Sequence, residues 1–386
     1  MNKADHQYLD LEKDIHHIRT ACTQCGACQT GCAFLQKYGL PGQIVDNWDF
    51  NRPDHQAIAY ECSLCGLCSA VCPEQIDLPA LLLAVRRRAV DEECIDLSKY
   101  RTILGYEKRG ASPMFSYYGL PAGCDTVFFP GCTLPGTRPV TTWQLFEHMQ
   151  RLVPNLGIVM DCCGKPSHDL GRQQYAGAMF EEMYRFLATN GIRNVLVACP
   201  NCHKMFQQYG NWMALQTVYE LIDAHDLPAG ATAAGALTVH DPCPLRMEGH
   251  VHDAVRRIIS KMGLTVKEMK HRRQRTLCCG EGGSVGFVCP DLANAWGAAR
   301  RREAGRRRLV TYCAGCAGYL GRVATTVHIV DLIFNPEKSM NGGPRVASSP
   351  MTYLNRIRLK RRFKTALKPA IQRVRPPLRR ILQKKG

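Results

Sequence analysis

The sequence predicts an α+β protein, with a mainly helical N-terminal domain followed by two repeated α/β cysteine-rich domains. Three observations lead to this fold class: two cysteine runs before residue 75, one order of cysteines repeated over residues 123–337, and a length of 386 residues, which suits two or three domains. Within each copy of the repeat, short apolar runs alternate with longer helical stretches, which indicates small parallel sheets. The predicted divisions are a domain at 1–104, a linker at 105–123, α/β domains at 124–230 and 231–337, and a basic tail at 338–386.

The cysteine content indicates metal binding. No apolar run approaches the roughly 20 residues of a membrane span, and the first residues lack the apolar core of a secretory signal. We therefore expect a cytoplasmic protein, in which thiols stay reduced and 21 cysteines do not form a disulfide framework.

The net charge of +17 is concentrated at the C-terminal end. Residues 338–386 hold 15 Lys and Arg and no acid, which leaves 35 basic and 33 acidic residues in the rest of the chain. The nearly neutral body argues against nucleic-acid binding, which needs a basic face. Apolar residues recur in the tail between arginines and lysines, and its prolines predict at best two short helical pieces. An anionic membrane surface or a membrane subunit is the favoured partner of this tail; an acidic soluble partner, a solvated tail and nucleic acid are the alternatives.

The N-terminal domain holds two runs with the spacing Cys-x2-Cys-x2-Cys-x3-Cys. This spacing is typical of proteins with two [4Fe–4S] clusters, in which the fourth cysteine of each run binds the cluster of the other run. Zinc is the alternative, but zinc ribbons need two pairs of ligands and not two runs of four. The predicted ligand sets are Cys22, Cys25, Cys28 and Cys72 for one cluster, and Cys62, Cys65, Cys68 and Cys32 for the other.

Each copy of the repeat carries the order Cys, Cys-Cys-Gly, Cys-x2-Cys. Five thiolates are too many for one zinc ion or one cubane, so the pattern indicates a larger metal site in each copy. The cysteines follow predicted strands, whose carboxyl ends gather at one edge of a parallel sheet. The first set is Cys132, Cys162, Cys163, Cys199 and Cys202, and the second is Cys243, Cys278, Cys279, Cys313 and Cys316.

In this combination the chain resembles the CCG-domain iron–sulfur family over about residues 15–337. The family includes the catalytic subunits of heterodisulfide reductases. It also includes the iron–sulfur subunits of anaerobic glycerol-3-phosphate dehydrogenase, glycolate oxidase and lactate-utilisation complexes. The resemblance implies that each complete five-cysteine set holds a noncubane iron–sulfur cluster at which a disulfide is cleaved. Both copies here are complete, and we assign the catalytic role to the second set because the glycines of residues 280–286 allow close backbone approach.

Other residues near these motifs are weaker candidates. For His203, His168 and Lys165, an ordinary surface position is the alternative to a catalytic role. Arg246, three residues after Cys243, is a cation that would raise the potential of a nearby cluster or hold an anionic substrate. His240 and Asp241 are expected to shape the turn before Cys243. The three remaining cysteines are expected to be unligated thiols: Cys94, Cys124 and Cys289.

Two versions of a redox function follow. In the first, electrons pass through the two [4Fe–4S] clusters to the cysteine-rich sites, which reduce a disulfide. In the second, the chain relays electrons from a flavin dehydrogenase to a quinone or membrane carrier. The expected partners are a flavoprotein, a membrane cytochrome b or a quinone-reactive subunit, and the expected location is the inner face of the cytoplasmic membrane, as a peripheral protein.

Overall fold

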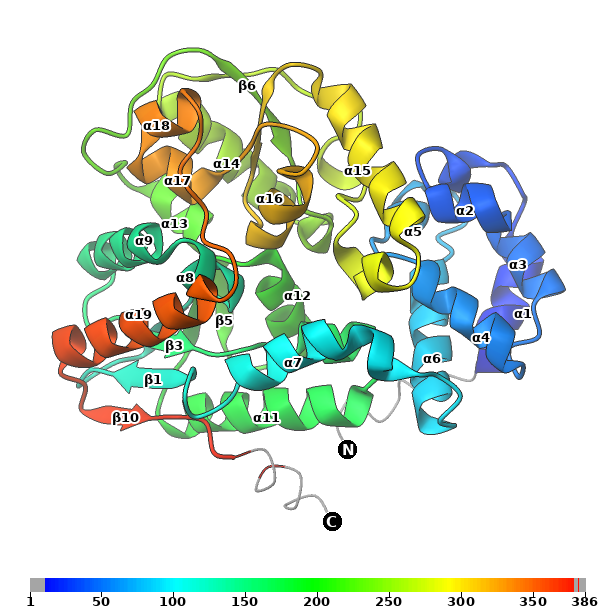
Figure 1. Cartoon of the computed structure of the whole chain (residues 1–386), viewed down its shortest axis with the longest axis horizontal. Coiled ribbons are helices and arrows are strands. Elements are labelled where there is room, and N and C mark those ends of the chain that lie inside the picture. Colours follow the sequence, from blue (N-terminus) through cyan, green and yellow to red (C-terminus); the bar gives the residue numbers. More distant parts are fainter. Residues whose placement is uncertain (1–10, 378–380, 382–386) are drawn as a thin grey trace.

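The computed structural model describes residues 11–377 and 381, and it contains a helical N-terminal domain and two sheet-based domains. In Figure 1 the N-terminal domain lies to one side, and the two sheet domains are stacked beside it. The core of the N-terminal domain combines apolar side chains of its short helices with cysteines of both runs. Its helices are α1 (Leu11–Ala21), α2 (Ala33–Tyr38), α3 (Pro41–Asn47), α4 (Pro53–Ile58), α5 (Leu67–Val71), α6 (Leu78–Asp91) and α7 (Arg101–Gly110).

The first sheet has the strand order β10-β1-β3-β2-β4-β5. Strands β2, β3, β4 and β5 are parallel, with Phe128 of β2 opposite Ile158 of β3 and Leu196 of β4. Strand β1 pairs antiparallel with both β3 and β10. Its strands are β1 (Tyr117–Leu120), β2 (Thr126–Phe129), β3 (Gly157–Met160), β4 (Asn194–Val197), β5 (Ala214–Thr217) and β10 (Ile371–Arg373). Its helices are α8 (Thr133–Thr137), α9 (Pro139–Leu152), α10 (Lys165–Asp169), α11 (Gln173–Thr189), α12 (Pro200–Tyr209) and α13 (Val218–Ala224).

The second sheet has the order β7-β6-β8-β9, and all its pairs are parallel. Val239 of β6 is opposite Val310 of β8, which is opposite Val327 of β9. The strands are β6 (Ala236–His240), β7 (Thr265–Val266), β8 (Arg308–Thr311) and β9 (Thr326–His328). The helices are α14 (Gly249–Lys261), α15 (Pro290–Ala304), α16 (Ala314–Leu320), α17 (Ile329–Phe334) and α18 (Pro336–Met340).

The two sheet domains share one apolar core, and buried polar groups join all three domains. Core residues include Leu196 of the first sheet and Val310 of the second. The Tyr219 hydroxyl lies 2.8 Å from the carbonyl oxygen of Ala198 and 3.1 Å from that of Tyr312, the residues before the first cysteine of each Cys-x2-Cys pair.

Arg86 of α6 connects the N-terminal domain to both sheet domains. Its fully buried guanidinium donates to the carbonyl oxygens of Asp169 in the first sheet domain and Gly283 in the second, at 2.6 and 3.1 Å. The cysteine motifs of the three domains are therefore held in fixed positions relative to one another.

Residues 105–123 do not form the linker that the sequence suggested. Helix α7 continues to Gly110, and β1 is a fully buried strand of the first sheet. The Gly, Ser and Pro content of the segment resembles that of a loop, but the tyrosines of β1 pack between two neighbouring strands.

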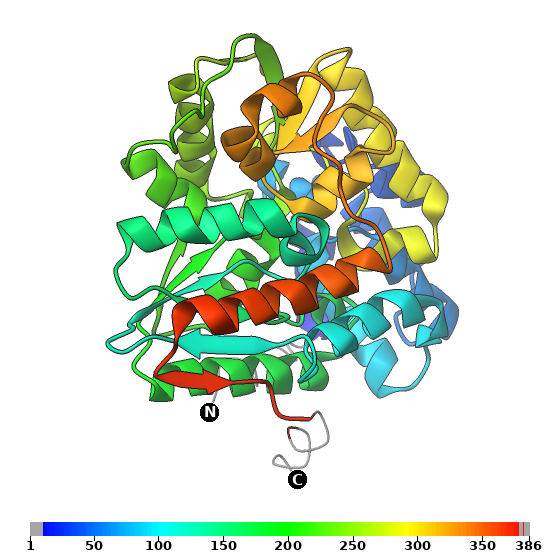
Figure 2. The ribbon, with the colours of Figure 1, turned by 60° about the vertical axis from the view of Figure 1, so that its left-hand side comes forward.

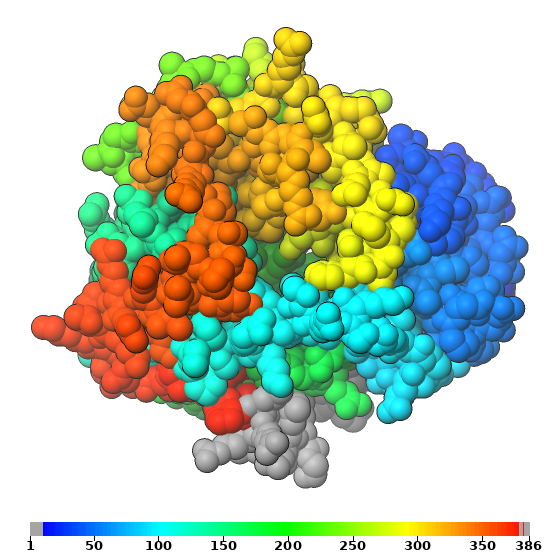
Figure 3. Space-filling view, in the orientation of Figure 1, coloured from blue at the N-terminus to red at the C-terminus, as the bar shows by residue number. Residues whose placement is uncertain are grey.

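Within its described residues, the basic segment is also not a free tail; residues 378–380 and 382–386 of the predicted tail lie outside them. Residues 351–367 form one helix, α19 (Met351–Leu367), and Pro369 does not interrupt it because this proline lies beyond its end. Residues 371–373 form β10 at the edge of the first sheet. Figures 2 and 3 show this segment lying along the first sheet domain. The apolar face of α19 is buried against α8, α9 and β1, with Leu359 and Phe363 in the shared core. A basic amphipathic helix has the same sequence pattern whether its apolar face meets lipid or a protein core, which is why the sequence favoured a membrane partner.

No helix within residues 11–377 combines the length and apolar character needed to cross a bilayer.

Candidate iron–sulfur sites

The cysteines of the two N-terminal runs group in space with their fourth members exchanged. Cys28 lies close to Cys22, Cys25 and Cys72, and these four line one small cavity. Cys32 lies close to Cys62 and Cys65, on the other side of the domain's core. This is the grouping expected for the two predicted ligand sets.

Left-handed backbone turns direct these thiols inward. Gln24 and Leu64, which precede the second cysteine of each run, have φ of 54° and 52°. Gly26 and Gly66 follow the same cysteines with φ of 76° and 70°. Positive φ is costly for residues other than glycine, so its recurrence at matching positions marks a conformation that the site requires.

The donor set fits a metal cluster better than it fits free thiols. Burial raises the pKa of Cys28 to about 11 and that of Cys62 to about 12, so without metal these side chains would be neutral. A bound cation cluster reverses this preference, because coordination removes the proton from a thiol. Eight cysteines gathered in two groups therefore suit two [4Fe–4S] clusters.

In the first sheet domain all five predicted cysteines lie at the carboxyl ends of strands. Cys132 follows β2, Cys162 and Cys163 follow β3, and Cys199 begins α12 after β4. The thiols of Cys132 and Cys162 are in contact, as are those of Cys163 and Cys202 and those of Cys199 and Cys202.

The second set forms a chain of neighbouring thiols. Cys278 contacts Cys243 and Cys279, and Cys316 contacts Cys279 and Cys313. The loop after Cys279 approaches closely, as its glycines predicted. The backbone N–H of Gly280 donates to Cys278 Sγ at 3.3 Å, and that of Glu281 donates to Cys279 Sγ at 3.5 Å. Gly280 has φ of 99°, and a Cβ there would lie 2.3 Å from the carbonyl oxygen of Ala293, so only glycine fits.

One N-terminal run adjoins the second site. The thiols of Cys65 and Cys278 are in contact. Arg246 fastens the two loops together, donating from Nε to the Cys65 carbonyl oxygen at 3.0 Å and from Nη2 to the Thr276 carbonyl oxygen at 2.9 Å. Arg246 therefore joins two loops, a role the sequence did not suggest, and its positive charge lies near the Cys65 thiol.

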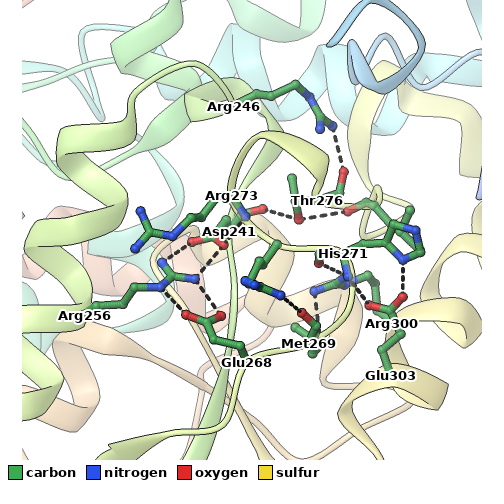
Figure 4. Close-up of polar contacts among 12 residues, drawn as sticks. Asp241, Arg246, Arg256, Glu268, Met269, His271, Arg273, Thr276, Arg300 and Glu303 are labelled. Carbon is green, nitrogen blue, oxygen red and sulfur yellow. Dashed lines mark hydrogen bonds and ion pairs between the residues drawn. The ribbon is translucent and has the colours of Figure 1, made fainter. Parts of the chain in front are cut away.

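Asp241 organises the loop that precedes Cys278 (Figure 4). Its carboxylate accepts two hydrogen bonds from Arg256, at 2.9 and 3.0 Å, and one from the backbone N–H of Arg273 at 2.7 Å. Its carbonyl oxygen accepts the Thr276 hydroxyl at 2.9 Å. Burial by itself would raise the pKa of Asp241, but the Arg256 guanidinium outweighs it and the pKa falls to about 2. Asp241 is thus ionised and holds the loop of residues 273–276, whereas the sequence suggested a role in its own turn before Cys243.

The two cysteine-rich sites face a common narrow cavity. Cys199 of the first site and Cys313 of the second both line it, together with Glu281 and His328. Glu281 is exposed, and a carboxylate oxygen of it and the sulfurs of Cys313 and Cys316 lie within 4.8 Å of one another. Sequence reasoning did not single out Glu281, because it was one residue of a glycine-rich loop and nothing showed that this loop faces the other repeat.

A larger cavity of about 600 Å³ opens where the three domains meet. It reaches Cys65 and Cys243, so it gives access to the second site. Lys204 lines it, and among the described residues its amine has no hydrogen bond or ion pair. Burial lowers the pKa of Lys204. No sequence pattern pointed to this lysine beyond its place two residues after Cys202.

The weaker sequence candidates have mainly structural roles. Lys165 and His168 both contact the carboxylate of Asp169, the latter at 2.9 Å. His203 and His168 are buried and not at the surface as the sequence suggested, and the carboxylates near His203 are those of Glu248 and Glu220. Cys94 and Cys124 donate to the carbonyl oxygens of Glu92 and Thr126, at 3.4 and 3.3 Å. Cys289 precedes α15 and is partly buried.

Comparisons with known proteins define the class. A family described as a 4Fe-4S dicluster domain matches residues 21–77, and a family described as a cysteine-rich domain matches residues 126–207 and 237–321. The protein is therefore an iron–sulfur redox protein with two [4Fe–4S] clusters and further iron–sulfur sites in its cysteine-rich domains. The chain belongs to the CCG-domain iron–sulfur family, and this confirms the predicted fold class and cofactors.

Three relatives illustrate the family. The chain is 25% identical to a subunit of the fumarate reductase (CoM/CoB) of Methanothermobacter marburgensis, over 76% of this chain and 66% of that one. It is 23% identical to a subunit of the dihydromethanophenazine:CoB–CoM heterodisulfide reductase of Methanosarcina barkeri, over 74% of this chain and 83% of that one. It is 24% identical to the EtfAB:quinone oxidoreductase of Syntrophomonas wolfei, over 33% of this chain and 19% of that one. The first two are subunits of redox complexes, so this chain is homologous to iron–sulfur subunits that work with partners.

Proposed function

We propose that the chain receives electrons from a partner subunit and uses them to reduce a disulfide at its second cysteine-rich site. The observation that carries the proposal is the contact between Cys65 and Cys278. It joins a predicted ligand of a [4Fe–4S] cluster to a predicted ligand of the second site. Cys28 and Cys68 are also near neighbours, so the two N-terminal groups and the second site form one continuous series.

The second set of five cysteines is the proposed catalytic site: Cys243, Cys278, Cys279, Cys313 and Cys316. Iron–sulfur clusters supply electrons one at a time, and the protein supplies ligands, proximity and tuned potentials. Reduction of a disulfide takes two electrons and two protons, breaks the S–S bond and yields two thiols. The first set of five would hold a second cluster of the same kind.

The large cavity is the proposed entrance for the disulfide. It reaches the second site at Cys243, and the amine of Lys204 places a positive charge on its wall. The cavity is lined by charges of both signs, so the positive charge of Lys204 acts locally and favours a ligand with one or two acidic groups near the sulfur atoms. The other charged lining residues are Arg87, Arg246, Asp14, Asp77, Asp169 and Glu248.

A relay function is the second candidate. It is favoured by the likeness to EtfAB:quinone oxidoreductase, whose name joins a flavoprotein to a quinone. In this version a flavoprotein donates electrons, and a membrane cytochrome b or quinone-reactive subunit accepts them. The exposed side of α19 holds Arg358, Arg361 and Lys364, so contact with an anionic membrane on the cytoplasmic side would be electrostatic, with the apolar side already buried.

The two functions separate in one anaerobic assay. Protein reduced by dithionite with methyl viologen is given either a set of small disulfides or a soluble menaquinone analogue, and thiol or quinol formation is measured. We expect thiol formation that is lost in Cys279→Ala and retained in part by the matched Cys163→Ala of the first site. Quinol formation without thiol formation would reject disulfide reduction and support the relay.

A further inference from the structure

The two cysteine-rich sites differ at the last residue of the strand that leads into each. Three residues before the first cysteine of its set, the first copy has Phe129 at the end of β2 and the second has His240 at the end of β6. Both positions are buried, at 0% and 1% exposure. Phe129 packs edge-on against Phe206, with ring centroids 5.3 Å apart. Phe129 is explained by this apolar ring packing, but a polar imidazole buried at the matching position is not.

His240 lies among sulfur atoms. One of its ring nitrogens and the sulfurs of Cys279 and Cys316 all lie within 4.8 Å of one another. Neither ring nitrogen makes a hydrogen bond of good geometry to the described residues, and the Cys279 thiol is the neighbour close enough to interact with the ring. A buried imidazole N–H left without a partner is unfavourable. The side chain thus presents an unused donor to the second metal site.

The nearby guanidinium of Arg300 has partners for both terminal nitrogens, while its Nε has none among the described residues. Arg300, also fully buried, lies on the same side and donates from Nη1 to the His271 carbonyl oxygen at 2.8 Å and from Nη2 to Met269 Sδ at 3.1 Å (Figure 4). Five thiolates already supply ligands to the second site, so an imidazole is not needed to complete the ligand set. Its N–H is suited to a hydrogen bond with metal-bound sulfur.

The second site also receives backbone donors that the first does not. The N–H groups of Gly280 and Glu281 donate to Cys278 Sγ and Cys279 Sγ. At the first site, the described residues give only a contact between Cys132 Sγ and the Thr133 hydroxyl, at 3.8 Å. Hydrogen bonds to cluster sulfur stabilise the more negative, reduced state and raise the reduction potential.

We propose that His240 donates an imidazole N–H hydrogen bond to the metal-bound sulfur of Cys279, and thereby makes the second centre easier to reduce than the first. His240 acts through a ligand and is a positioning residue. The effect suits a site that is the end point of the electron path. The inference rests on the second site holding an iron–sulfur centre, which the iron content of the parent protein tests separately.

The test is an anaerobic redox titration followed by electron paramagnetic resonance, in which the second centre's signal is the one that Cys279→Ala removes. His240→Phe copies the residue of the first repeat, so the fold accommodates it, and it should shift the midpoint potential of this signal downward. His252→Phe is the matched control. His252 is also buried in the second domain with both nitrogens unpartnered, but it faces Asp241 and Arg256.

A second measurement looks at the bond itself. With ¹⁵N-labelled histidine, the parent should show a nitrogen coupling and an exchangeable proton coupling to the second centre, and both should vanish in His240→Phe at unchanged iron content. An unchanged potential in His240→Phe, or an equal shift in His252→Phe, would overturn the proposal. Absence of both couplings in the parent would overturn it as well.

Discussion

The Arg375 guanidinium forms a buried ion pair with the Asp161 carboxylate, 2.8 Å between Nε and Oδ2, although 214 residues separate them in sequence. Both side chains have 0% exposure. The other oxygen of Asp161 accepts the backbone N–H of Cys162 at 2.7 Å. Arg375 of the C-terminal segment therefore holds the carboxylate that binds the backbone of Cys162.

Replacing Arg375 should damage the first site. Arg375→Met leaves the Asp161 charge buried and unpaired, which costs about 3–5 kcal/mol. We expect a lower free energy of unfolding and loss of iron from the first site, measured by denaturant unfolding and iron analysis. Arg373→Met is the control, because Arg373 pairs with Glu182 at about 20% exposure and should cost under about 1 kcal/mol. Equal effects of the two changes would contradict the special role of Arg375.

Deleting residues 351–386 gives opposite results under the two accounts of this segment. A free tail, as the sequence suggested, would leave iron content unchanged. The structure predicts unfolding of the first sheet domain, because deletion removes Leu359 and Phe363 from the core and β10 from the sheet edge. Loss of one such phenylalanine alone costs about 3–5 kcal/mol. Circular dichroism and iron analysis of the truncated protein decide between them.

The exposed charges of α19 are tested without touching its core. Arg358→Gln combined with Arg361→Gln should leave folding and iron content unchanged, since both side chains are exposed. Binding to anionic lipid vesicles should weaken in this variant and fall as salt rises, because exposed charges are screened over about 8–10 Å. Vesicle binding equal to that of the parent would mean that these arginines do not meet a membrane.

The sequence predicted most of what depends on cysteine spacing and little of what depends on packing between distant segments. Repeated motifs and strand–helix alternation predicted two parallel-sheet domains, and the spacing of the N-terminal runs predicted the exchange of Cys32 and Cys72. The contact of Cys65 with Cys278, the place of Lys204 on the cavity wall and the ion pair of Arg375 join parts of the chain that are far apart. No local pattern encodes such contacts.

Replacing cluster ligands should separate the N-terminal groups from the second site. The complete protein should hold about 16 irons if two cubanes and two sites of about four irons each assemble. Cys25→Ser should remove one cubane and leave the signal of the second site intact, because Cys25 is exposed and far from it in the series. Cys65→Ser should disturb both its own cubane and the second site, since it contacts Cys278. Iron near eight per parent chain would show that the cysteine-rich sites are empty.

Lys204 should select the charge of the substrate. Lys204→Met should raise KM for a disulfide that carries carboxylates, by about 10- to 150-fold if one charge-assisted hydrogen bond of about 1.5–3 kcal/mol is lost. KM for a neutral disulfide should not change. Lys204→Arg, which keeps the charge, should retain most of the preference. If Lys204→Met and Lys204→Arg have the same KM for the charged disulfide and the same KM for the neutral one, Lys204 does not contact the substrate.

The buried carboxyl of Glu107 should make stability depend on pH. This side chain of α7 is 2% exposed and accepts the backbone N–H of Ser167 at 3.1 Å, next to the first cysteine-rich site. Burial raises its pKa from 4.5 to about 6. Between these two values the unfolded chain releases the proton while the folded chain keeps it, so the free energy of unfolding falls as pH rises through this window. The loss is complete above pH 6 and amounts to about 2 kcal/mol.

Glu107→Gln stays neutral at every pH and should remove this slope. Its amide oxygen still accepts the Ser167 N–H, so the variant should equal the parent near pH 4.5 and exceed it above pH 6. Anaerobic denaturant unfolding at matched pH from 4.5 to 7.5 measures the difference in the free energy of unfolding between the parent and the variant. Iron loss that affects both proteins equally does not change this difference. Glu337→Gln, at an exposed position of α18, is the control and should follow the parent throughout. A Glu107→Gln curve parallel to that of the parent would show that Glu107 is ionised in the folded protein across the whole range.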